Sequence, residues 1–406
     1  MSKLEVTLAD VEQARGVLSS ILEPTPLLAN RWLSERLGCE IYLKLENMQP
    51  IGSFKIRGAT YKISRLSSAE RRKGVITASA GNHAQGVAWG CARFKTKSTI
   101  VMPKNAPLTK VQNTEALGAK ILLEGDNYDE AYAAAVKIAK KTGVVFVHPY
   151  DDADVIAGQG TVGLEIMEQL PDVDAVIGAM GGGGLMAGVA TVIKEFKPKT
   201  TVVAVQASGA RSLIESLRRG KVYSTGTADT FADGIKVVEP RPNMVHLLKP
   251  LVDVLAHADD EAIASAVLML MEKAKVVAEG AAALPLAVLE QMKAKFHGKK
   301  VVLIITGGNI DVNVLSRIID RGLIQAGRRV RVDVSISDRP GSLNRLTDLI
   351  ARQGANILQA IHDRDTPSAG LNETTVELTL ETRGPEYSRE LIKALREQVI
   401  RLDVLH

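Results

Sequence analysis

Residues 1–320 alternate short apolar runs with amphipathic segments, and this alternation limits the possible fold more than any other feature of the sequence. Seven runs are predicted as strands: Gly74–Ala78, Thr99–Met102, Lys120–Leu123, Val144–Val147, Ala175–Ala179, Val202–Gln206 and Val301–Ile305. Between them, segments such as Tyr128–Lys141 and Thr161–Gln169 repeat apolar residues with the period of a helix. Apolar strands separated by helices predict an α/β fold, with a parallel sheet covered by helices on both faces.

The pattern changes near Arg328. Val330, Val332, Val334 and Ile336 alternate with polar residues, which indicates a strand with one buried face. Further elements follow: a helix with Leu343, Leu346, Leu349 and Ile350 on one face, strands at Asn356–His362 and Thr374–Leu380, a helix at Glu386–Glu397 and a strand at Val399–Val404. The order βαββαβ predicts a separate α/β-plait module over residues 328–406.

Composition narrows the class of protein. Apolar residues make up 46% of the chain, and the net charge of +5 is spread over interspersed acidic and basic residues, so we expect a sizeable core and no nucleic-acid partner. No stretch is apolar enough to span a membrane, and residues 1–9 lack the apolar region of a signal peptide, so a cytoplasmic protein is expected. Cys39 and Cys91 are expected to be buried thiols, and no histidine pair has metal-ligand spacing, so no metal is expected.

Three glycine-rich segments follow predicted strands, which is where parallel-sheet proteins bind ligands. The first reads Ser79-Ala80-Gly81-Asn82-His83-Ala84-Gln85-Gly86. Its small residues allow close approach of a ligand, and the helix that follows offers free N–H groups to a carboxylate. Asn82 both donates and accepts, which suits a ring hydroxyl. An ordinary turn with a helix cap is the alternative, and for His83 capping or packing is favoured over catalysis.

The second segment is Gly181-Gly182-Gly183-Gly184-Leu185, between a predicted strand and a predicted helix at Met186–Lys194. Consecutive glycines can turn their N–H groups inward to bind an anion, and phosphate is the natural ligand. The segment lacks the lysine and hydroxyl residue of a P-loop, and a flexible loop is the alternative. The third segment, Thr306-Gly307-Gly308-Asn309, places one neutral hydroxyl at a strand end.

Lys55 lies in the run Ser53-Phe54-Lys55-Ile56-Arg57-Gly58. Phe54 and Ile56 flank it, and the small residues Ser53 and Gly58 allow close packing around it. A lysine that is desolvated in this way has a lowered pKa and can form a Schiff base with a carbonyl compound. Lys55 is therefore the candidate nucleophile, although most lysines are simply solvated.

The four segments together, in this order and at these spacings, resemble the threonine dehydratases. Pro24-Thr25-Pro26-Leu27 and Lys44-Leu45-Glu46-Asn47 are similar to the N-terminal pattern of that family. The resemblance covers roughly residues 5–325. It implies a tryptophan-synthase-β-like fold (fold type II) that uses pyridoxal 5′-phosphate, with a catalytic domain at 1–327 and a smaller subdomain inserted at approximately 46–150.

The resemblance also implies a role for each segment. Lys55 carries the cofactor as a Schiff base, with Phe54 beside it. The cofactor phosphate binds the backbone N–H groups of Gly181, Gly182, Gly183, Gly184 and Leu185. Asn82 contacts the ring hydroxyl, and Thr306 faces the ring nitrogen where many relatives have serine. The amino-acid substrate is expected at Ser79, Ala80, Gly81 and His83.

Residues 328–406 resemble an ACT domain, a small module that binds amino acids and pairs between chains. Its ligand turn is matched by Asp338-Arg339-Pro340-Gly341-Ser342, and its facing strand start by Asn356 and Ile357. The resemblance implies a homo-oligomer, a dimer or a tetramer, that is allosterically regulated by a small amino acid. A tail that serves only for dimerisation is the alternative.

The expected activity is that of an L-threonine ammonia-lyase, which forms 2-oxobutyrate and ammonia by β-elimination and also acts on L-serine, in isoleucine biosynthesis or in degradation. Serine racemase or serine dehydratase is the alternative enzyme, and an amino-acid sensor without activity is a third hypothesis. Ala80 disfavours racemisation, because serine racemases have a serine there. Gln206 disfavours a metal site, because metal-using relatives have glutamate there.

Overall fold

The computed structural model describes residues 4–364 and 370–405. The chain divides into two compact units, Met1–Ile310 and Asp311–His406, each of which is described here by itself. Helix α14 (Val312–Gln325) falls in the second unit, whereas the sequence places the boundary between residues 327 and 328. Among the described residues, no helix is both long and apolar enough to cross a bilayer.

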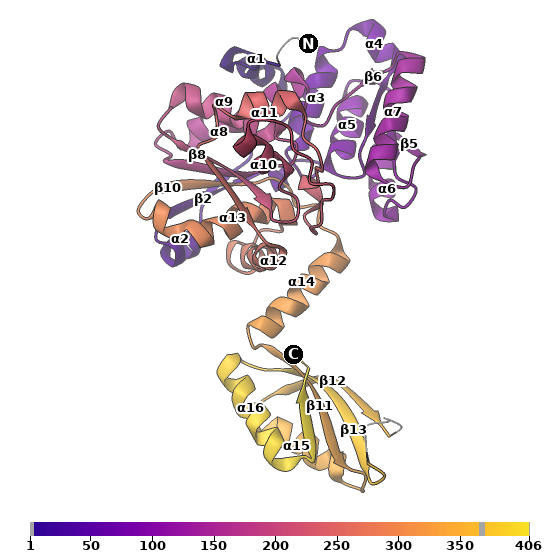
Figure 1. Cartoon of the computed structure of the whole chain (residues 1–406), viewed down its shortest axis with the longest axis vertical. Helices are drawn as coiled ribbons and strands as arrows, with labels where there is room; N and C mark the ends of the chain where they lie inside the picture. The colour runs from indigo at the N-terminus through magenta and orange to yellow at the C-terminus, as the bar shows by residue number, and fades with distance from the viewer. Residues whose placement is uncertain (1–3, 365–369, 406) are drawn as a thin grey trace. The chain divides into compact units, whose positions relative to one another are not determined.

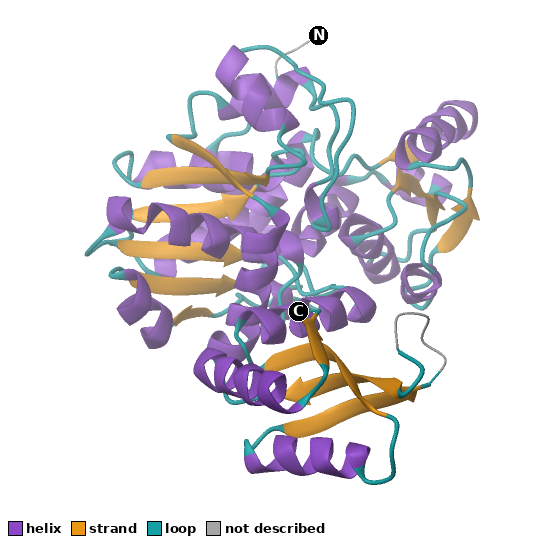
Figure 2. Ribbon diagram, turned by 60° about the horizontal axis from the view of Figure 1, so that its bottom comes forward, coloured by secondary structure: helices purple, strands orange, loops and turns teal. Residues whose placement is uncertain are grey.

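The first unit contains a six-stranded sheet in the order β1-β2-β10-β7-β8-β9. Its strands are β1 (Leu27–Ala29), β2 (Glu40–Leu45), β7 (Ala175–Ala179), β8 (Thr201–Ala207), β9 (Val254–Ala258) and β10 (Lys300–Ile305). All neighbours are parallel except β1 and β2. Helices lie on both sides of this sheet (Figure 2). The carboxyl ends of β2, β10 and β7 therefore meet at one edge, where Gly181 and Thr306 follow their strands.

A second sheet in the same unit has the order β5-β4-β3-β6, and all its strands are parallel. Its strands are β3 (Val75–Ala78), β4 (Ser98–Met102), β5 (Lys120–Leu123) and β6 (Val145–Phe146). The four strands lie within residues 46–150, the segment expected to form an inserted subdomain. All seven strands predicted in residues 1–320 exist, but they are divided between two sheets.

The helices of the first unit separate successive strands (Figure 1). They are α1 (Leu8–Leu18), α2 (Arg31–Leu37), α3 (Lys55–Arg65), α4 (Ser68–Lys73), α5 (Asn82–Arg93), α6 (Leu108–Glu115), α7 (Tyr128–Thr142), α8 (Ala153–Gln169), α9 (Gly184–Phe196), α10 (Ser212–Arg219), α11 (Pro242–Leu248), α12 (Asp260–Met269) and α13 (Gly280–Met292). Short helical turns are η1 (Glu46–Met48), η2 (Asp233–Ile235), η3 (Leu270–Ala274) and η4 (Lys293–Phe296).

Helix α8 is longer than the predicted Thr161–Gln169 segment. Asp152 caps its first turn by accepting N–H groups of Asp154 and Val155, and Val155 through Ile166 are all buried. A helix that is buried on every side has no polar face, so its first half lacks the periodicity that marks an amphipathic helix. Gly158 of α8 packs against Gly58 of α3 so closely that a Cβ on Gly158 would lie 2.6 Å from the Gly58 Cα.

The second unit has the predicted order βαββαβ after α14. Its elements are β11 (Arg329–Ser337), α15 (Ser342–Arg352), β12 (Asn356–Asp363), β13 (Glu373–Glu381), α16 (Pro385–Gln398) and β14 (Arg401–Val404). They form an antiparallel sheet in the order β12-β13-β11-β14. Val330, Val332, Val334 and Ile336 are buried, as their alternation predicts. Of the residues predicted on one face of α15, Leu346 and Ile350 are buried, whereas Leu343 is 37% exposed.

Candidate active site

Lys55 begins helix α3 directly after a segment that is tied to the third glycine-rich loop. The Phe54 N–H donates to the Thr306 carbonyl at 3.1 Å, and Ser53 forms an isolated bridge with Gly307. The Lys55 Nζ donates to the Pro149 carbonyl at 3.0 Å and lies 5.2 Å from the centroid of the Phe54 ring. Two segments about 250 residues apart thus place the amine at the edge where β10 ends.

The environment of Lys55 favours a neutral, nucleophilic amine. Burial lowers the pKa of Lys55 to about 8, although the charge of Glu279 opposes this shift. His83 and His148 have pKa values lowered to about 3, mainly by burial, so both rings are neutral near pH 7. Of Lys55, His83 and His148, Lys55 therefore has the pKa closest to neutral pH. The direction of its shift is the one that its apolar flanking residues suggest.

Asn82 begins helix α5 and joins the first glycine-rich segment to the third. Its Nδ2 donates to both carboxylate oxygens of Glu279, at 2.9 and 3.1 Å, and its Oδ1 accepts from Asn309 Nδ2 at 2.7 Å. Asn309 Nδ2 also donates to the Ile51 carbonyl. These bonds fix the orientation of the Asn82 amide.

The loop that carries the expected substrate contacts lies between β3 and α5. The Ser79 Oγ accepts the Gly81 N–H at 3.1 Å, and a Cβ on Gly81 would meet no atom within 4 Å. Ala80 is half-buried and packs on the core of the smaller sheet. The His83 side chain is buried, and its Nε2 bonds to the Val147 carbonyl at 3.1 Å, which agrees with a packing role.

The tetraglycine segment connects β7 to α9, and Gly183 adopts a left-handed conformation with φ +96° as the cap of α9. A Cβ on Gly182 would lie 2.2 Å from Cδ1 of Tyr150, so no other residue fits without moving that ring. Tyr150 follows Pro149, which accepts from Lys55, so the loop after β6 contacts both the lysine and the glycines. The free N–H groups of a helix N-terminus at this point suit a phosphate.

The residues present fit pyridoxal 5′-phosphate, the cofactor that the resemblance implies. Thr306 Oγ1 is buried and has no hydrogen-bond partner among the residues described, as expected of a group whose partner is a ligand. The glycine segment provides a cradle that side chains would fill, and Lys55 provides an amine of lowered pKa. Thr306 could thus hold the ring nitrogen, and the glycines could hold the phosphate. Asn82 could hold the ring hydroxyl, and Lys55 the aldehyde.

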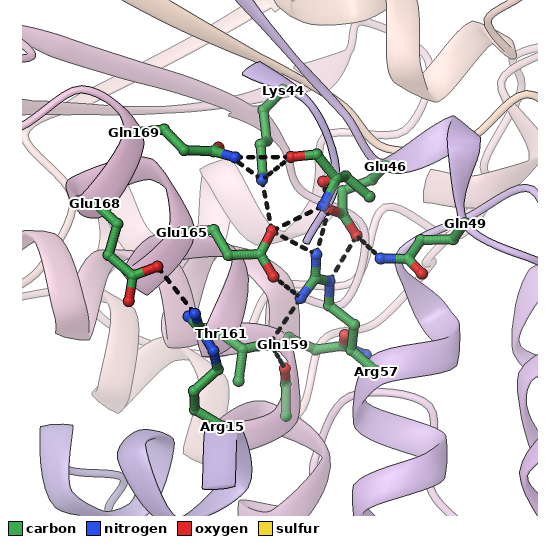
Figure 3. A network of polar contacts seen from close by, with 12 residues as sticks. Arg15, Lys44, Glu46, Gln49, Arg57, Gln159, Thr161, Glu165, Glu168 and Gln169 are labelled. Carbon is green, nitrogen blue, oxygen red and sulfur yellow. Dashed lines mark hydrogen bonds and ion pairs between the residues drawn. The ribbon is translucent and has the colours of Figure 1, made fainter. Parts of the chain in front are cut away.

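A buried network of charges surrounds Arg57, which is two residues after Lys55 in the chain (Figure 3). Arg57 contacts Glu46 and Glu165, and Lys44 donates to Glu165 at 2.5 Å. All four side chains are 3% exposed or less. Two positive and two negative charges balance, so the network is neutral, and it links β2, η1, α3 and α8.

The expected effector residues do not form one site within a chain. Asp338 follows the end of β11 where Ser337 pairs with Glu373, whereas Asn356 pairs with Glu381 at the other end of β13. Gly341 has φ +85° and precedes α15, as a tight turn requires. Ser342 accepts from Arg345, and Asn356 donates weakly to Glu381 at 3.5 Å. Asn356 and Ile357 are therefore separated from the turn by the length of the sheet.

Sequence reasoning missed Glu279, Tyr150 and Glu165 as residues of the site and of its support. Glu279 and Glu165 are each the single charged residue of an otherwise uncharged run, Val276–Leu289 and Val155–Ile166. An isolated charge in such a run could have identified both residues from the sequence. The residue Gln206, singled out as arguing against a metal, accepts the Ile214 N–H at 2.8 Å.

Comparison with known proteins adds independent findings. A family model described as "Pyridoxal-phosphate dependent enzyme" matches residues 18–307. The L-threonine ammonia-lyase of Thermotoga maritima is 48% identical over 391 residues, which cover 96% of this chain and 97% of that protein. The processed form of threonine deaminase isoform 2 from Solanum lycopersicum superposes with a TM-score of 0.74 at 35% identity, over 79% of this chain and 95% of that one. Maize serine racemase superposes with a TM-score of 0.73 at 31% identity, over 79% and 98%.

Proposed function

This chain belongs to the family of pyridoxal-phosphate dependent enzymes, and we propose that it is an L-threonine ammonia-lyase with secondary activity on L-serine. The observation that carries the proposal is the 48% identity over nearly the whole chain to an enzyme of that name. The buried Lys55, whose Nζ donates to the Pro149 carbonyl, supports it. The overall reaction converts L-threonine to 2-oxobutyrate and ammonia.

The residues that would hold the cofactor are Lys55 at the aldehyde, the glycines from Gly181 to Gly184 with Leu185 at the phosphate, Asn82 at the ring hydroxyl and Thr306 at the ring nitrogen, with Phe54 beside the lysine. When bound, the cofactor supplies an electron sink for the charge that develops on the substrate α-carbon. Thr306 is a neutral partner and adds no charge to the ring.

Lys55 supplies the base. With a pKa of about 8, a useful fraction of its amine is neutral near pH 7.5 and can take the proton from the substrate α-carbon. The β-hydroxyl then leaves as water, and the 2-aminocrotonate that results takes up water and releases ammonia. Ser79, Ala80 and Gly81 lie before the N-terminus of α5, whose N–H groups suit the substrate carboxylate, as does the backbone of His83.

Serine racemase is the second candidate, and the similarity to the maize enzyme favours it. Racemisation needs a group that delivers a proton to the opposite face of the α-carbon, and Ala80 has no proton to deliver. We therefore expect elimination to dominate. An assay that measures oxo acid from L-threonine and L-serine, together with a chiral assay for D-serine, decides between them. Abundant D-serine with little oxo acid would refute the proposal.

A Lys55→Ala variant tests the site itself. It should lose both turnover and the visible absorbance of a covalently bound cofactor, because no other residue of the site offers an amine in this place. A Lys62→Ala variant, which removes a surface-side lysine of the same helix that pairs with Asp152 and Asp154, is the matched control and should keep both.

We also propose that the second unit is an ACT-like regulatory module and that the protein is a cytoplasmic homo-oligomer. The βαββαβ order and the antiparallel sheet support this, and so does the near-complete alignment with the Thermotoga maritima enzyme, which extends into residues 311–406. Because Asp338 and Asn356 lie at opposite ends of the sheet, a ligand that contacts both needs two copies of the chain. Deleting residues 311–406 should abolish any response to isoleucine or valine while catalysis remains.

A further inference from the structure

Glu279 lies at the cofactor end of the site, and nothing in the proposed chemistry uses it. It caps helix α13, its N–H donates to the Gly307 carbonyl at 3.0 Å, and its backbone carbonyl accepts from Ala282 and Ala283. A Cβ on Gly307 would lie 2.8 Å from Glu279 Oε1, so the carboxylate directly faces the third glycine-rich segment. The backbone therefore fixes this acidic side chain beside the residues expected to surround the cofactor ring.

The carboxylate determines how Asn82 presents its amide. Both oxygens of Glu279 accept from the Nδ2 group of Asn82, while Asn309 donates to its Oδ1. An amide nitrogen has two N–H groups. With one directed to the carboxylate and the amide oxygen held by Asn309, the amide cannot flip, and the second N–H keeps a single direction.

The charges around Glu279 and Lys55 come from several elements. Lys110 of α6 and Asp233 of η2 form an ion pair at 2.9 Å. The charge of Asp233 raises the pKa of Glu279, whereas the charges of Lys110 and Lys55 lower it. Around Lys55 the other titratable groups are His83 and His148, which are neutral because burial lowers their pKa values. Burial raises the pKa of Glu279 itself, and its negative charge opposes the lowering of the Lys55 pKa by burial.

We propose that Glu279 is a positioning residue of the cofactor site, which orients the Asn82 amide through its two carboxylate oxygens. The inference rests on the proposed function only in that the site must bind the cofactor, and it does not depend on which amino acid is the substrate. Without this carboxylate, Lys55 would deprotonate at lower pH and Asn82 would lose its fixed orientation.

The charge effect can be measured without cofactor. Lys55 in the apoprotein is modified with acetic anhydride across a pH series, and the extent of modification is read by peptide mass spectrometry. In Glu279→Gln the midpoint should shift to lower pH by about 0.5 to 1 unit, which is a roughly three- to tenfold higher ratio of neutral to protonated amine at a given pH. Glu279→Asp keeps the charge and should stay near the wild-type midpoint. Glu35→Gln, which removes an exposed carboxylate paired with Arg31 on α2, should not move it.

The orienting effect is read from cofactor retention. Glu279→Ala and Asn82→Ala should each speed the loss of pyridoxal 5′-phosphate, and the double variant should lose it no faster than Asn82→Ala alone, because both act through the same amide. Additive effects in the double variant, or a Glu279→Ala protein that loses the cofactor no faster than wild type, would overturn the proposal. A shifted midpoint in a protein that never binds the cofactor would support the role of Glu279 on Lys55 and refute the proposed function.

Discussion

The guanidinium of Arg57 forms two parallel hydrogen bonds with the carboxylate of Glu46, Nε to Oε2 at 2.8 Å and Nη2 to Oε1 at 2.7 Å. Arg57 is two residues after Lys55, and Glu46 follows the end of β2. The paired geometry is specific to arginine, because lysine offers no planar fork. The start of α3 is therefore fixed in rotation as well as in position relative to the larger sheet.

Replacing Arg57 by methionine should destabilise the protein by about 3–5 kcal/mol, because Glu46 and Glu165 would stay buried with less compensating charge. Urea unfolding of the apoprotein measures this. Arg31→Met removes an exposed arginine that is paired with Glu35, and as the control it should leave the free energy of unfolding nearly unchanged. Equal losses in the two variants would show that the buried network contributes no special stability.

Glu165→Gln should make the free energy of unfolding less dependent on pH in the acidic range. Arg57 and Lys44 outweigh the desolvation of Glu165 and hold its pKa below the usual 4.5. Its contribution is present above the usual pKa of glutamate and is lost as the pH falls through the lowered folded value, because the unfolded chain binds the proton more tightly. Unfolding free energies measured between pH 6 and 3 should fall less steeply in the variant. The same slope in both proteins would contradict the prediction.

Gly182→Ala should weaken recognition of the cofactor phosphate. The added methyl group would lie 2.2 Å from the Tyr150 ring, so either the ring or the glycine segment must move. Pyridoxal 5′-phosphate should lose affinity, whereas pyridoxal, which has no phosphate, should lose little. Gly16→Ala is the control: a Cβ there meets no atom within 4 Å, and the change should stabilise α1 by up to about 1 kcal/mol.

Thr306→Val should have opposite effects in the apoprotein and the holoprotein. In the apoprotein it removes a buried hydroxyl that has no partner among the described residues, so stability should be unchanged or higher by about 1–3 kcal/mol. With cofactor bound, the hydrogen bond to the ring nitrogen is lost, so the stabilisation by pyridoxal 5′-phosphate should shrink. Thr306→Ser keeps the hydroxyl and should retain the cofactor-dependent rise in Tm. A variant that gains as much Tm from cofactor as wild type would argue against this contact.

The sequence predicts the strands that are marked by a short apolar run with clear ends. It misses strands whose residues are explained only by contacts with distant segments. Ala175–Ala179 and Lys120–Leu123 match the observed bounds, because each is a short apolar run with clear ends. Strand β2 was missed because the charged Lys44 interrupts its apolar run; in the folded chain Lys44 is buried and donates to Glu165, Gln169 and the Thr25 carbonyl. The division into two sheets depends on pairing between distant segments, which no local pattern contains.

The candidate site shows the same limit. Lys55, Asn82 and the glycines stand in motifs, and the structure gives each a position at a strand end or helix start. Glu279 acts through contacts with residues about 200 positions away, so its environment exists only in the folded chain. Asp338 and Asn356 are near in sequence and distant in the sheet, because β12 runs parallel to β11 on the far side of β13.

The place of β10 has a consequence for synthesis on the ribosome. It is the last strand of the first unit to be made, yet it lies in the middle of the sheet, between β2 and β7. Until residues 300–308 emerge, those two strands have unpaired edges, and the bond from Phe54 to Thr306 cannot form. A nascent chain that stalls before this point therefore has an incomplete active site and two strand edges with unpaired N–H and C=O groups, which can pair with another chain.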